Sequence, residues 1–329
     1  MSTKMKELIA AVLITAFFLA AYFWFPKPLN FSPTVSLILI IIMALTFVYI
    51  GIRTFMGKFV ERRIVFVYVG VALTLPFFMQ FKLPVPISPE VQSAFDAVKN
   101  LSPGSKILAA YDYDPPSEPE LQPMADAFMK YCFDHELKVI IVGLWPQGPQ
   151  QADQSIEAAL EYKPEFAQKV KYGEDYVNLG FQSGNEFVIL RMGESFKAMF
   201  PKDVNGTPYE DIPLLKGVKN YSNIDYCMNF SAGKPGTQEW VQGAVDRYGL
   251  KMSAGNTAVQ APMMYPFLQG GQLDGLMGGM AGAAEFELLT GYPGKASTYI
   301  KSQTFAHVVV VFFIIIGNLA FFKTGRRKK

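Results

Sequence analysis

Residues 106–113 read KILAAYDY and residues 138–145 read KVIIVGLW, and these two stretches decide the fold that the sequence predicts. Each is a short, almost continuous apolar run, which is typical of a strand covered on both faces of a sheet. Between them, residues 120–137 carry apolar side chains at helical spacing. A strand, a helix and a second strand of these lengths predict a βαβ unit with parallel strands.

The same alternation of strand and helix continues as far as residue 290. We expect further strands at residues 175–181, 223–230, 250–255 and 273–277. Helices are expected at residues 91–101, 154–170, 185–200, 237–249, 259–268 and 281–290. The sequence therefore predicts an α/β domain over residues 82–303, with a Rossmann-like, mainly parallel sheet and helices on both of its faces.

Four apolar runs flank this domain, at residues 8–25, 35–52, 64–81 and 305–322. Each has about 18 residues without a charge, which is close to the shortest helix that crosses a bilayer core of about 30 Å. We therefore predict a membrane protein with four transmembrane helices. Three lie in an N-terminal anchor at residues 1–81, and the fourth lies with a basic tail in residues 304–329.

Basic residues in the short flanking segments predict the orientation of these spans. Lysine and arginine cluster at the N-terminus, between the second and third runs, and in the C-terminal tail KTGRRKK. All three clusters fall on one side of the membrane if the four runs cross it in turn, and basic loops stay in the cytoplasm. We expect an integral protein of the inner or plasma membrane, in contact with membrane lipid, with both termini cytoplasmic and the α/β domain extracytoplasmic.

The acidic and basic residues are distributed unevenly between the α/β domain and the rest of the chain. Residues 82–303 contain 18 Lys and Arg and 26 Asp and Glu, which gives a net charge of −8. The remainder of the chain contains 12 Lys and Arg (30 − 18) and 2 Asp and Glu (28 − 26), which gives a net charge of +10. Binding to a nucleic acid needs a basic surface that neutralises phosphates. The acidic domain therefore excludes a nucleic acid as its expected partner.

Polar residues follow several predicted strands, at the edge where open parallel sheets bind ligands. Asp112 and Asp114 follow the first strand, Ser231 follows the strand at 223–230, and Asn256 follows the strand at 250–255. We expect these four residues to form a candidate ligand site. Two neighbouring carboxylates can hold Mg²⁺ or Ca²⁺, so Asp112 and Asp114 are also the candidate metal ligands; we expect no other cofactor. Capping of the following helix by these two carboxylates is the alternative role.

The Asp-x-Asp pair formed by Asp112 and Asp114 resembles the opening motif of the haloacid-dehalogenase-like phosphatases. The resemblance covers about ten residues and implies Asp112 as the nucleophile and Asp114 as the general acid and base. Members of that family continue with a Ser or Thr after the next strand and with a late acidic pair. Here the second strand ends in Gly143-Leu144-Trp145, and the last strand offers only Asp274.

A run of glycines lies where the last strand is expected to turn into the last helix. Gly275, Gly278, Gly279 and Gly282 fit neither a Walker loop nor a dinucleotide-binding fingerprint, and no Lys, Ser or Thr accompanies them. Backbone amides in such a turn can bind an anion. Close packing, within the domain or against a second subunit, is the interpretation that we favour.

Histidine and cysteine offer little catalytic chemistry. His135 is the only histidine of the domain and falls at an expected helix end, and neither Cys132 nor Cys227 has an obvious histidine partner. The two cysteines are too few for a disulfide framework, which leaves one bridge or two buried thiols open.

Three functions are compatible with these features. Our leading hypothesis is a structural or assembly role in the cell envelope, in which the α/β domain self-associates into a homo-oligomer or larger membrane assembly. The excess of glycine and methionine in residues 263–280 favours pliable contacts of this kind. The first alternative is an extracytoplasmic protein that binds a small ligand or a divalent cation, and the second is a metal-dependent, phosphatase-like hydrolase.

Overall fold

A computed structural model of the chain describes residues 31–56, 61–79, 81 and 84–325, together with Met5, Ile9, Val12 and Ala16. The chain divides into two compact units. Val85–Ser297 forms the α/β domain, and Met1–Pro84 together with Thr298–Lys329 forms the second unit, called here the helical unit.

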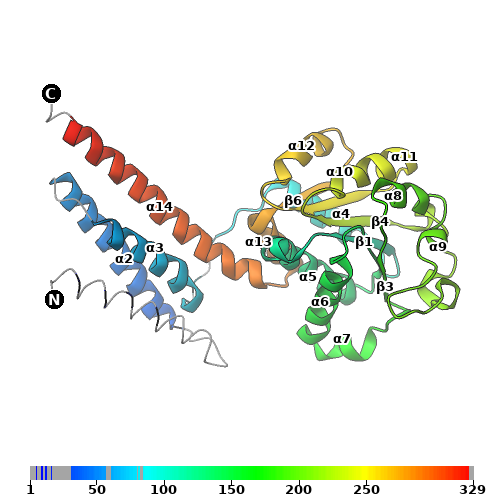
Figure 1. Ribbon diagram of the computed structural model, residues 1–329. Helices are drawn as coiled ribbons and strands as arrows, with labels where there is room; N and C mark the ends of the chain where they lie inside the picture. Colours follow the sequence, from blue (N-terminus) through cyan, green and yellow to red (C-terminus); the bar gives the residue numbers. More distant parts are fainter. Residues whose placement is uncertain are drawn as a thin grey trace. The chain divides into compact units, whose positions relative to one another are not determined.

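The α/β domain is built on a six-stranded sheet in which every pair of neighbouring strands is parallel. Its strands are β1 (Lys106–Asp112), β2 (Lys138–Gly143), β3 (Tyr176–Phe181), β4 (Tyr226–Ser231), β5 (Met252–Asn256) and β6 (Gly275–Gly278). They are arranged in the order β3-β2-β1-β4-β5-β6 (Figure 1). The predicted α/β class and parallel sheet are thus confirmed. This order is that of a doubly wound fold, whose strand order reverses between β1 and β4.

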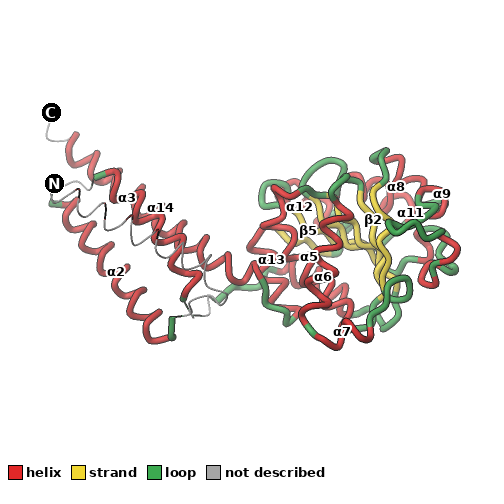
Figure 2. The backbone as a smooth tube through the Cα atoms, turned by 60° about the horizontal axis from the view of Figure 1, so that its bottom comes forward, coloured by secondary structure: helices red, strands yellow, loops and turns green. Residues whose placement is uncertain are grey.

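Helices cover both faces of the sheet (Figure 2). The first face is covered by α4 (Pro89–Lys99), α5 (Glu118–Asp134), α6 (Gly148–Tyr162) and α13 (Gly279–Thr290), with α5 packed against both α6 and α13. The second face is covered by α8 (Glu186–Met192), α10 (Thr237–Trp240), the π-helix η6 (Val241–Val245), α11 (Asp246–Tyr248) and α12 (Ala261–Gln269). Short helices occur in the connections: η2 (Pro115–Ser117), α7 (Pro164–Lys169), α9 (Phe196–Met199), η3 (Tyr209–Asp211), η4 (Pro213–Leu215) and η5 (Tyr221–Asn223).

Side chains of β1 alternate between the two faces, as the period of a strand requires. Leu108 and Ala110 belong to the core beneath the helices of the second face. Tyr111 points the other way, and its ring lies 5.3 Å from that of Phe230. Asp112 therefore points to the second face, at the carboxyl end of the strand.

The helical unit contains α2 (Pro33–Phe55), α3 (Arg62–Thr74), the 3-10 turn η1 (Leu75–Phe78) and the part of α14 (Lys295–Gly325) that begins at Thr298. Its helices pack through aromatic rings and polar contacts. The rings of Phe47 on α2 and Phe312 on α14 lie 4.5 Å apart. The hydroxyl of Tyr68 on α3 donates to the carbonyl oxygen of Met43 at 3.0 Å.

Two described helices, Pro33–Phe55 and Lys295–Phe322, are long and apolar enough to cross a membrane. The predicted third span, residues 64–81, is wrong in length, because the apolar helix there covers only Ile64–Phe78 and its α-helical part ends at Thr74. Pro76 lies in the 3-10 turn that follows; proline lacks the amide hydrogen that would continue the α-helix. The predicted first span, residues 8–25, lies outside the described residues except for Ile9, Val12 and Ala16.

Candidate functional site

The predicted ligand site lies where the doubly wound sheet reverses, at the carboxyl ends of β1, β4 and β5. Asp112 is the register partner of Ser231, and Ser231 is the partner of Asn256. Asn229, two residues before Ser231, points to the same face of the sheet. The structure thus brings Asp112, Ser231 and Asn256 together, as the sequence predicts.

Asp112 is completely buried and is held by three donors. Its Oδ1 accepts from the backbone N–H of Leu144 at 2.8 Å. Its Oδ2 accepts from Asn229 Nδ2 at 2.7 Å and from Trp240 Nε1 at 2.7 Å. Trp240 itself is fully buried, and its indole contacts Asp112 at the edge of the sheet where doubly wound folds bind ligands. The carboxylate therefore joins β1, β4, α10 and the β2–α6 loop.

Burial also changes the acidity of this carboxyl. The pKa of Asp112 is raised to about 7, because desolvation penalises the charged form more than the hydrogen bonds of Leu144, Trp240 and Asn229 favour it. A nucleophilic or metal-binding carboxylate has to present a free oxygen to its partner. Both oxygens of Asp112 already have donors from the protein, and the hydrolase hypothesis gains no support from this geometry.

A chain of buried polar side chains continues from Asp112 across β4 and β5. Thr237 Oγ1 donates to Asn229 Oδ1 at 2.7 Å and accepts from Asn256 Nδ2 at 2.8 Å. Asn256 Nδ2 also lies 3.0 Å from Gln260 Oε1, and Gln260 Nε2 donates to the carbonyl oxygen of Gly233 at 3.0 Å. These buried side chains thus hydrogen-bond one another at this edge of the sheet.

Asp114 plays a separate, local role. Its Oδ1 accepts from the hydroxyl of Ser117 at 3.0 Å, at the start of η2. Its carboxylate makes no hydrogen bond to a backbone N–H at the start of η2, so the capping expected as the alternative role is not seen at Asp114. Within the described residues, no group of three or more His, Cys, Asp or Glu side chains is arranged to hold a metal ion. The predicted Mg²⁺ or Ca²⁺ site at Asp112 and Asp114 stays a prediction.

The glycine turn of β6 and α13 packs tightly against the domain itself. A Cβ atom on Gly275 would lie 2.2 Å from the backbone nitrogen of Ala94 on α4, and one on Gly282 would lie 3.0 Å from the backbone of Met277. Gly279 begins α13 with a φ of +57°, which a residue with a side chain rarely adopts. A Cβ atom on Gly278 would lie 3.1 Å from the Cβ atom of Ala261.

Cys132 and Cys227 are buried free thiols. Desolvation raises the pKa of each thiol well above its usual range. Both are therefore held in the thiol form, which is a poor nucleophile.

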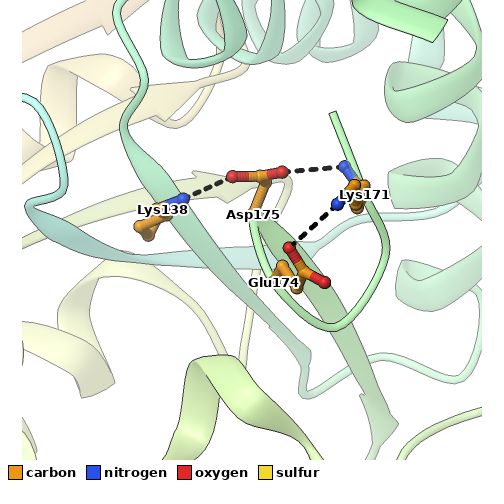
Figure 3. A network of polar contacts seen from close by, with 4 residues as sticks. All are labelled: Lys138, Lys171, Glu174 and Asp175. Atoms are coloured by element: carbon orange, nitrogen blue, oxygen red, sulfur yellow. Dashed lines mark hydrogen bonds and ion pairs between the residues drawn. The ribbon is translucent and has the colours of Figure 1, made fainter. Parts of the chain in front are cut away.

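Charged side chains line two cavities of the α/β domain. The first, which we call the N-edge cavity, has a volume of about 380 Å³ and lies where β2 begins. Lys138 and Asp175, which line it, form an ion pair, and Asp175 Oδ2 also accepts from the backbone N–H of Lys171 at 2.8 Å. Figure 3 shows Asp175 between these two lysines, with Lys171 also paired to Glu174. Lys138 and Asp175 are thus paired, whereas Glu136, Glu165 and Lys169, which also line this cavity, form no ion pair among the described residues.

The second, which we call the α5–α6 cavity, has a volume of about 350 Å³ and lies between α5, α6 and the turn from α13 to α14. A volume in this range is typical of small-molecule sites. Its polar lining comprises Gln122, Asp126, Lys130, Gln154, Glu157, Glu161, Glu287, Tyr292 and Lys295. None of the six charged side chains forms an ion pair within the described residues. We had not predicted these residues as a site.

The floor of the α5–α6 cavity comes from consecutive turns of α5, with Gln122, Asp126 and Lys130 spaced four residues apart. Gln122 anchors it by donating to Asp126 Oδ1 at 2.8 Å and accepting from the hydroxyl of Tyr113 at 2.7 Å. Burial raises the pKa of the Asp126 carboxyl, although Lys130 and Lys295 act in the opposite direction. The cavity therefore holds a desolvated carboxyl beside two ammonium groups.

In comparisons with protein-family models, curated proteins and solved structures, no match to this chain was found.

Proposed function

We propose that this protein is a membrane-anchored binding protein whose α/β domain takes up a small polar ligand in the α5–α6 cavity. The observation that carries this proposal is the burial of Asp126 and Lys130, which are 8% and 9% exposed and have no ion-pair partner among the described residues. Charged groups are rarely buried without a partner, because desolvation is costly. A bound ligand would supply the missing partners.

Anchoring in a membrane is supported by the two long apolar helices. Only 17% of the most apolar stretch of α2 and 6% of that of α14 is buried by the chain itself. Apolar helices left so exposed need another apolar environment, and a bilayer provides one. We propose a four-span anchor, in which the predicted first span crosses at residues 8–25 and α3 with η1 makes a short third crossing.

The proposed topology can be tested with two cysteine variants of the full chain in intact cells. A membrane-impermeant maleimide is expected to label Glu165→Cys, on the exposed surface of α7, and to leave Lys329→Cys in the basic tail unlabelled until the cells are opened. The wild type serves as the control, because its own two thiols are buried. Equal labelling of both variants in intact cells, or protection of both, would contradict an extracytoplasmic domain with a cytoplasmic C-terminus.

Ligand binding can be tested by equilibrium dialysis of the full chain in detergent against a library of amino acids, carboxylates, amines, sugars and nucleotides. We expect at least one compound to be retained by the wild type and by Glu165→Gln, whose substitution lies in the N-edge cavity. Retention by Lys130→Gln is expected to fall about tenfold, since the substitution removes the buried ammonium group. Retention of nothing, or equal retention by Lys130→Gln, would refute the proposed site.

Self-association of the α/β domain is a second candidate function, favoured by the surface around the start of α12. Val259 is 85% exposed and Met263 is 60% exposed, whereas Met264 and Met277 are buried in the core. Exposed methionine and valine suit an adaptable contact between copies. The mass of the full chain in mild detergent tests this: an oligomer that Met263→Gln converts to a monomer supports it, and a monomeric wild type refutes it.

A further inference from the structure

The unpaired charges of the α5–α6 cavity carry both signs. Asp126 Oδ1 accepts from Gln122 and from the hydroxyl of Ser155, at 2.8 and 3.0 Å, whereas Oδ2 makes no hydrogen bond within the described part of the chain. Lys130 Nζ lies 5.0 Å from the centroid of the Tyr162 ring and makes no hydrogen bond or ion pair there. A carboxylate oxygen and an ammonium group therefore remain available, one helical turn apart.

A ligand with a single charge fits this cavity poorly. A simple cation would pair with Asp126 but would add positive charge beside Lys130 and Lys295. A simple anion would pair with the lysines but would be repelled by Asp126 and by Glu157 and Glu161 of α6. Each would leave one desolvated group unsatisfied, which costs binding free energy.

A molecule that carries both charges close together satisfies both groups. We propose that the α5–α6 cavity binds a small zwitterion of the α-amino acid class, with its ammonium group on Asp126 and its carboxylate on Lys130 and Lys295. This inference rests on the proposed function and names the ligand class of the same site. Because the ammonium and carboxylate groups of an α-amino acid are attached to one carbon, the ligand bridges two protein charges that form no ion pair with each other. The Lys130 ammonium also lies over the Tyr162 ring, in a cation–π contact that stabilises its charge.

The test is calorimetric titration of the full chain in detergent with L-alanine, L-glutamate and L-lysine, and with acetate and methylamine as single-charge fragments. At least one amino acid is expected to bind about tenfold or more tightly than either fragment, because only the zwitterion pairs with both protein charges. Asp126→Asn and Lys130→Gln are each expected to weaken that binding by about tenfold or more. Lys169→Gln, which lies in the N-edge cavity, is the matched control and should bind like the wild type.

The possible outcomes separate the ligand class from the site. Binding of acetate or methylamine as tightly as any amino acid would overturn the zwitterion and keep the site. If the protein binds other compounds of the library but no amino acid, and Lys130→Gln abolishes that binding, the zwitterion is likewise overturned and the site is kept. Absence of all binding would overturn both proposals. Asp126→Asn changes the hydrogen bonds to Gln122 and Ser155, so the folding of this variant has to be checked. Lys130→Gln breaks no hydrogen bond among the described residues, so it keeps the test valid if Asp126→Asn does not fold.

Discussion

Replacing Asp112 with alanine is expected to lower the free energy of unfolding of the α/β domain by about 4 kcal/mol. The substitution leaves three buried donors, Leu144 N–H, Asn229 Nδ2 and Trp240 Nε1, without an acceptor. Water cannot replace the carboxylate easily, since Asp112, Asn229 and Trp240 are all fully buried. The lost bonds also connect two strands, a helix and a loop, so the cost is felt across the carboxyl edge of the sheet.

Asp114→Ala provides the matched control for this prediction. Among the described residues, the Asp114 carboxylate accepts one hydrogen bond, from the Ser117 hydroxyl, and Asp114 is partly exposed, so its loss should cost less than about 1 kcal/mol. Urea unfolding of the full chain in detergent, followed by tryptophan fluorescence, measures both values. If the two variants unfold at the same urea concentration, the buried network is not what stabilises this edge.

The raised pKa of Asp112 also predicts how stability changes with pH. In the unfolded chain this carboxyl loses its proton near its ordinary pKa of 3.8, whereas in the folded domain it keeps the proton up to about pH 7. Between these values the folded state binds more protons than the unfolded state, so this group makes the free energy of unfolding fall as the pH rises. Above about pH 7 its contribution becomes constant.

Asp112→Asn isolates this contribution, because asparagine does not titrate. At pH 5 the variant resembles the protonated wild type, because its side chain keeps one acceptor oxygen and carries N–H groups at the other position, where the protonated carboxyl carries an O–H group. The difference in free energy of unfolding, wild type minus variant, should fall as the pH rises to 7 and then stay level. A difference that rises over the same range would mean that the buried carboxyl has a lowered pKa.

The strands were the most predictable part of the fold. The runs KILAAYDY and KVIIVGLW become β1 and β2, because a strand covered by helices on both faces has to be apolar at almost every position. The order of the strands in the sheet was harder to predict from the sequence. Parallel pairing could be inferred from the βαβ spacing, but only the structure shows that β4 returns to the far side of β1.

The site was predictable only in part, for a physical reason. Residues at the carboxyl ends of parallel strands meet at one edge, which places Asp112, Ser231 and Asn256 together from the sequence alone. That Trp240 donates a hydrogen bond to Asp112 could not be predicted, because the two residues lie 128 positions apart in the sequence. The α5–α6 cavity has only a weak signal, polar residues four apart within α5, and such spacing is also typical of a solvated helix face.

Replacing Glu287 with alanine is expected to lower the free energy of unfolding of the α/β domain by about 3 kcal/mol. Glu287 is almost completely buried, and its carboxylate receives four hydrogen bonds at the start of α14. Its Oε2 accepts from the backbone N–H groups of Gly294 and Ser297 and from the Ser297 hydroxyl, and its Oε1 accepts from the N–H of Ala296. The amides of Ala296 and Ser297 lie in the first turn of the helix, where N–H groups have no intrahelical acceptor, and the negative charge offsets the positive end of the helix dipole.

Comparison with Glu287→Gln and with a surface glutamate separates charge from hydrogen bonding. Glu287→Gln keeps one acceptor oxygen but loses the charge, so it should lie between the wild type and the alanine variant. Glu165→Ala, on the exposed surface of α7, should be close to the wild type, because this side chain has no hydrogen bond or ion pair among the described residues. Amide hydrogen exchange provides the local measurement: Ala296 and Ser297 should exchange faster in Glu287→Ala than in Glu165→Ala. Unchanged exchange at these two amides would show that water replaces the carboxylate, and that the start of α14 is held by its apolar packing instead.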